Sequence, residues 1–138
     1  MKHRRFSAAA AAAVFACAVG AQTPASTLWN GVWQGELDGQ PAVTLTLADD
    51  SGNLGGTVVF NRIERQTQGP PRVASIEPHV LVDPQADRKR LSFEIMRPDR
   101  AESPLKFAVT LDGSDEAHIH CLNCGPDAPV AELVRMQP

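Results

Sequence analysis

The sequence has no tyrosine, and its two tryptophans and five phenylalanines make up only 5% of the chain. It also has no Gly-x-Ser-x-Gly nucleophile turn, His-Glu-x-x-His zinc helix, phosphate-binding loop or dinucleotide-binding glycine pattern. After residue 22, no long stretch places apolar residues at helical spacing. These absences disfavour an enzyme, a nucleotide cofactor and a helical fold.

Positive charge is also scarce once the N-terminus is set aside. Residues 1–21 hold three of the 13 basic side chains and none of the 16 acidic ones, which leaves 10 against 16. A domain with this acidic balance disfavours nucleic acid and anionic membrane surfaces as partners. The one basic run, Arg88-Lys89-Arg90, lies beside Asp83 and Asp87, and we interpret it as part of a solvated loop.

Residues 1–21 are typical of a secretory signal peptide. Three basic residues precede an apolar run from Ala8 to Val19, and small residues follow before Gln22. The apolar run is too short to span a membrane. We therefore expect a secreted or periplasmic protein in which residues 22–138 form a single domain.

The leader has a second interpretation, in which Val14-Phe15-Ala16-Cys17 is an imperfect lipobox. A lipid on Cys17 would then tether the mature protein to a membrane. Under either interpretation Cys17 is not available to form a structural disulfide in the mature domain. Cys121 and Cys124 are then the cysteines left in an oxidising compartment.

Beyond the leader, the recurring pattern is period-two alternation of apolar and polar residues, broken by Gly, Asp and Pro. It predicts strands at 28–37, 42–47, 54–60, 80–82, 91–96, 105–111, 117–122 and 130–136. Prolines predict irregular loops at 66–75 and 98–104. We expect an all-β fold: an antiparallel up-and-down meander of about eight strands that closes into a small barrel, because closure removes exposed edges.

Gly31-Val32-Trp33 matches the Gly-x-Trp signature of lipocalins. The stretch WQGELDGQPAVTLTLADDSGNLGGTVVF, which begins at Trp33, resembles the opening hairpin of calycin barrels generally, including avidins. The resemblance implies a calycin-like barrel in which Trp33 plugs one end and packs against the last strand. The chain departs from these families in having no Trp beyond Trp33, no Tyr and no other lipocalin motif, so no ligand is implied.

A closed barrel of this size has an interior that is either filled by side chains or able to hold one small apolar molecule. The candidate pocket residues are Trp33, Val43, Leu45, Leu47, Phe93, Ile95, Phe107 and Val109. In the same scheme Trp29 lies at the rim or mouth of the pocket. A filled barrel would favour another role, as an interaction or inhibitor module that presents the 66–78 loop to a cell-envelope protein.

The segment from His118 to Asp127 holds two histidines and two cysteines. Alternation places His118 and His120 together on the outer face of a strand, where two imidazoles can chelate Zn²⁺ or Cu²⁺. Cys121 faces the other way, and Cys124 lies in a turn. The expected compartment favours a Cys121–Cys124 disulfide over a redox pair, while a metal-binding protein centred on His118 and His120 stays an alternative.

Overall fold

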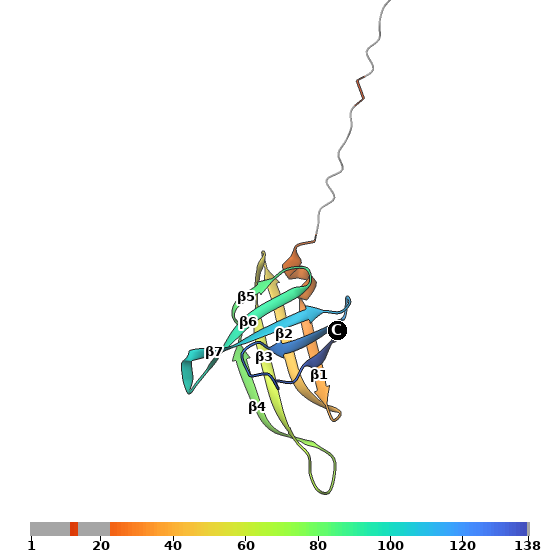
Figure 1. Cartoon of the computed structure of the whole chain (residues 1–138). Coiled ribbons are helices and arrows are strands. Elements are labelled where there is room, and N and C mark those ends of the chain that lie inside the picture. The colour runs from red at the N-terminus through yellow and green to blue at the C-terminus, as the bar shows by residue number, and fades with distance from the viewer. Residues whose placement is uncertain (1–11, 14–22, 138) are drawn as a thin grey trace, which may run out of the picture.

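The computed structural model describes residues 12–13 and 23–137, so Cys17 and all of the expected signal peptide except residues 12–13 lie outside the described residues. The chain forms one sheet of nine antiparallel strands that curls into a nearly closed barrel (Figure 1). The predicted all-β meander is confirmed. The described residues contain no helix long and apolar enough to cross a membrane.

The strands follow one another around the barrel in chain order. Their bounds are β1 (Gly31–Leu37), β2 (Gln40–Asp50), β3 (Asn53–Glu64), β4 (Arg72–Val80), β5 (Val82–Ala86), β6 (Arg90–Arg97), β7 (Arg100–Leu111), β8 (Glu116–Cys121) and β9 (Ala131–Arg135). The first and last strands pair, with Trp33 opposite Arg135, so the wall is continuous where the chain begins and ends. The edges of the sheet are β4 and β5, in the middle of the chain.

β4 and β5 are separated by a single residue, Leu81, and together make one long bent strand. The first part pairs with β3 and the second with β6. Leu81 is buried, and its amide donates to the carbonyl of Gly56 in β3 (3.1 Å). Counted as one, β4 and β5 give the eight strands that alternation predicts, but the bend separates β4 from β6 and opens the barrel wall there.

One end of the barrel is closed by the N-terminal segment (Figure 1). A 3-10 turn, η1 (Ala25–Trp29), precedes β1. The indole of Trp29 donates to the Asp87 carbonyl (2.8 Å), and that of Trp33 donates to the Trp29 carbonyl (3.0 Å). Both tryptophans are fully buried. The expectation that Trp29 lies on a strand at the rim of a pocket is therefore wrong, because the chain turns before Gly31 and folds the first indole into the core.

Prolines misled the placement of three segments. The segment 66–75 was predicted to be a loop, but β4 begins at Arg72, so the last four of these residues are in a strand. Pro78 also lies within β4. The strand predicted at 80–82 contains the last residue of β4 and the first of β5, with the corner at Leu81 between them, so its bounds were far too short. Pro78 in β4 and Pro84 in β5 are tolerated because both strands are at the edges of the sheet. An amide hydrogen that is missing on the free side of an edge strand breaks no ladder of hydrogen bonds.

The predicted loop at 98–104 is a hairpin turn followed directly by β7. Pro104 lies in the first part of β7, which pairs with β6, whereas the pairing of β7 with β8 begins at Phe107. The missing amide hydrogen of Pro104 is tolerated here for the same reason as at the sheet edges. The β6–β7 hairpin and the β3–β4 hairpin both project beyond the body of the barrel (Figure 1).

Candidate functional site

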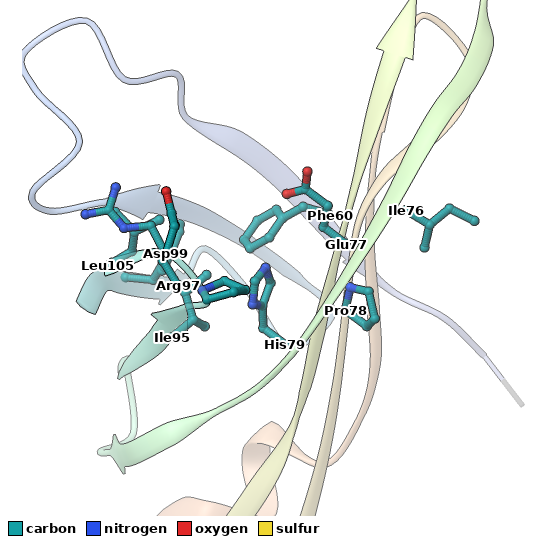
Figure 2. A pocket seen from close by; sticks show the side chains of 11 residues that line it. Phe60, Ile76, Glu77, Pro78, His79, Ile95, Arg97, Asp99 and Leu105 are labelled. Carbon is teal, nitrogen blue, oxygen red and sulfur yellow. The ribbon is translucent and has the colours of Figure 1, made fainter. Parts of the chain in front are cut away.

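A lateral cleft of about 690 Å³ opens in the barrel wall between β4 and the β6–β7 hairpin. Its lining comes from four strands and one turn: Phe60, Ile76, Glu77, Pro78, His79, Ile95, Arg97, Pro98, Asp99, Leu105 and Phe107. In Figure 2, Phe60, Glu77 and His79 face the β6–β7 hairpin across the cleft, and Ile76 points to the outside. The cleft exists because the bend at Leu81 leaves β4 without a partner on this side.

The floor of the cleft is apolar and continuous with the core. Ile95 and Phe107 are only 1% and 8% exposed. The ring of Phe60 stacks on that of Phe107 with centroids 5.3 Å apart, and Phe107 stacks in turn on Phe93 at 5.5 Å. Three aromatic rings thus form a row from the cleft into the barrel. A flat or extended apolar molecule would find favourable ring contacts along it.

The mouth of the cleft carries charged and titratable groups from both sides. Glu77 and His79 come from β4, Arg97 ends β6, and Asp99 lies in the turn that follows. The guanidinium of Arg97 donates to the Ser103 carbonyl (3.0 Å), which holds it along the β6–β7 hairpin. Both signs of charge are therefore present around an apolar floor, the arrangement by which many ligand pockets orient an amphipathic molecule.

All eight side chains that alternation assigned to the barrel interior are buried. Two of them, Ile95 and Phe107, line the lateral cleft. The other six pack in the core: Trp33, Val43, Leu45, Leu47, Phe93 and Val109. In the described structure these side chains pack together in the core around Trp33, and the lateral cleft lies at the side of the barrel.

The sequence reasoning missed the β4 side of the cleft, because it interpreted most of this segment as a loop. The inward direction of Phe60 was available from the alternation that starts at buried Val58. The register then pairs Val58 with His79 and Phe60 with Glu77, which turns both polar side chains toward the interior. That register belongs to the pairing of β3 with β4 and could not be read from the β4 segment alone.

The histidine pair lies on the outer face of β8, as alternation predicts. Ala117 and Ile119 are buried, and the half-buried rings of His118 and His120 stack with centroids 6.3 Å apart. Nδ1 of His118 lies 2.9 Å from Oδ2 of Asp112. Among residues 12–13 and 23–137, no group of three or more His, Cys, Asp or Glu side chains is arranged to hold a metal ion. Metal binding by this pair stays a prediction.

Cys121 and Cys124 are joined by a disulfide, with Cα atoms 5.5 Å apart. Asn123 between them ties the turn to β7. Its side-chain oxygen accepts from the Lys106 amide (2.9 Å), and its amide nitrogen donates to the Pro104 carbonyl (3.0 Å). The turn after β8 is thus fixed by a covalent link and two side-chain hydrogen bonds.

Comparison with known proteins adds little to these observations. No protein-family model matches the chain, and no curated protein matches it. Among solved structures, a redesigned beta barrel is similar to 83% of this chain and 96% of that chain, with 16% sequence identity and a TM-score of 0.43.

Proposed function

We propose that the protein is an exported, non-enzymatic β-barrel that binds a small, mainly apolar molecule in the lateral cleft. The observation that carries the proposal is the cleft itself, whose apolar floor and polar mouth meet at the gap in the wall. Its volume of about 690 Å³ falls within the range of about 300–1,000 Å³ that is usual for small-molecule sites. The leader-like pattern of residues 1–21 supports export to the periplasm or beyond.

A calycin-like character is part of this proposal. It is supported by Trp33, which is buried at one end of the barrel beside Arg135 of the last strand. This is the arrangement that the resemblance of the first hairpin implied. The proposed site is the lateral cleft and not the barrel centre beside Trp33, because core side chains pack around Trp33 there.

The alternative role as an interaction module that presents the 66–78 loop stays open, but one form of interaction, the addition of a partner strand to the edge of the sheet, receives less support. A protein partner that adds a strand needs a row of free backbone groups. Pro78 interrupts that row in β4, and Pro84 does so in β5. Prolines on edge strands commonly prevent such pairing. A small molecule needs no ladder, so the same edge admits it.

The proposal is tested with 8-anilinonaphthalene-1-sulfonate, an amphipathic aromatic probe, by isothermal titration calorimetry. His79→Trp places a large ring in the cleft, and His118→Trp places the same ring on the outer face of β8, where His118 lines neither the cleft nor the smaller cavity at the barrel end, as a matched control. We expect His79→Trp to weaken probe binding at least tenfold and His118→Trp to leave it unchanged. The proposal fails if the wild type does not bind the probe, or if both variants bind it as the wild type does.

A further inference from the structure

A second, smaller cavity of about 250 Å³ lies at the end of the barrel below the turn that carries the disulfide. Its lining is almost wholly apolar: Val43, Phe60, Phe107, Ile119, His120, Cys121, Cys124, Ala128, Pro129 and Ala131. Ala128 and Pro129, from the segment between β8 and β9, form one side of it, and the Cys121–Cys124 disulfide borders it. We call this space the inner chamber.

The inner chamber and the lateral cleft share two walls, the side chains of Phe60 and Phe107. Phe107 is 8% exposed and is held by the ring of Phe93 on its other side. Phe60 is only half-buried and lies at the cleft mouth beside His79, with ring centroids 6.3 Å apart. Phe60 therefore has the greater freedom, and its rotation would join the two spaces into one apolar channel.

We propose that the ligand of the cleft is a single-chain amphiphile whose alkyl tail passes Phe60 and Phe107 and ends in the inner chamber. This inference rests on the proposed function and adds the class of molecule that the cleft takes. A thin, flexible chain fits because the passage is bounded by two aromatic rings, whereas a bulky polycyclic ligand would stay in the cleft.

The mouth of the cleft suits a head group with both signs of charge. Arg97 can donate to a phosphate, for which guanidinium groups have a suitable geometry. Glu77 and Asp99 can face a cation, and the rings of Phe60 and His79 offer the kind of aromatic surface that quaternary ammonium groups prefer. The alkyl phosphocholines combine these two charges with one apolar chain.

The test is a calorimetric titration with hexyl, octyl, decyl and dodecyl phosphocholine, each kept below its micelle-forming concentration. For the wild type, we expect affinity to rise about fourfold for each added methylene that is buried. Ala128→Phe fills the inner chamber, and we expect it to bind the hexyl probe as the wild type does but to gain no affinity with longer chains. Ala48→Phe adds the same ring at an exposed position on β2 outside both cavities, and it should retain the full chain-length dependence.

If Ala128→Phe gains as much affinity for each added methylene as the wild type does, the tail assignment is overturned. If His79→Trp still weakens binding in that case, the proposed function is unaffected. Absence of binding by every probe, the anilinonaphthalene included, would overturn both. If Ala128→Phe fails to fold, Ala131→Val gives the same comparison, because Ala131 also lines the inner chamber. In that variant the chain-length gain should end at a shorter probe than in the wild type, and an unchanged profile would refute the tail assignment.

Discussion

The guanidinium of Arg135 lies 4.2 Å from the centroid of the Trp33 ring, on the strand that closes the barrel. The same side chain donates to the carbonyls of Leu28 (2.6 Å) and Asn30. It also pairs with Asp115 at 3.1 Å. One residue of β9 therefore holds together the 3-10 turn, the first strand and the β7–β8 turn. The planar fork of arginine permits several of these contacts at once.

Arg135→Ala should lower the free energy of unfolding by about 3 kcal/mol, because it removes charge-assisted hydrogen bonds and a ring contact together. Arg135→Lys should restore less than half of that loss, since lysine keeps the charge but not the fork. Urea denaturation followed by tryptophan fluorescence measures both. Arg62→Ala, which removes an exposed pair with Glu64, is the control, and a loss as large as that of Arg135→Ala would contradict the assigned role.

Gly56→Ala should destabilise the protein by about 3 kcal/mol or more, because overpacking against backbone cannot be relieved by a rotamer change. A Cβ built on Gly56 would overlap the carbonyl oxygen of Thr46 in β2. The adjacent Gly55 has nothing within 4 Å of the same position, so Gly55→Ala is a matched control and should change stability by less than about 1 kcal/mol. Thermal unfolding compares the two, and equal effects would exclude close strand approach as the cause.

Replacement of Cys121 and Cys124 by serine should cost about 2 kcal/mol or less of unfolding free energy, because the bridge closes a very short loop. The barrel should remain folded, since Asn123 still joins the turn to β7. Far-UV circular dichroism and urea denaturation provide the measurement. A variant that no longer unfolds cooperatively would show that the disulfide is required for the fold.

Asp87 should contribute to the loss of stability in acid. Hydrogen bonds from the backbone amides of Lys89 and Arg90 hold its pKa below the usual value of an aspartate. The folded state therefore favours the charged form, so this contribution is present above the unfolded pKa of about 3.9 and is lost as pH falls through the lower folded pKa. Asp87→Asn should make stability less dependent on pH below about 4.

Unfolding by urea at a series of acidic pH values measures the effect of Asp87→Asn. Asp127→Asn, an exposed change in the turn before β9, is the control and should follow the wild type. A wild-type pH profile in Asp87→Asn would assign the acid sensitivity to other carboxylates, such as that of Asp38, whose pKa is lowered by its hydrogen bonds and charge interaction with Arg65.

Much of the barrel interior could be predicted from local patterns. Leu45 and Leu47, Phe93 and Ile95 were all expected to point inward, and all are buried. The cleft could not be found in this way. Its β4 wall depends on the register of β4 against β3, and its opening depends on a corner at one residue, Leu81.

Periodic alternation and turn-forming residues are enough to specify the all-β meander and the inward face of most strands, because both arise from neighbouring residues along the chain. The position of the sheet edges is a different matter. Whether Pro78 breaks a ladder or lies harmlessly at an edge depends on which strands surround it, and the side on which the wall opens depends on how Leu81 meets Gly56. Only the assembled tertiary structure decides these points, since strand pairing joins residues that the sequence keeps far apart.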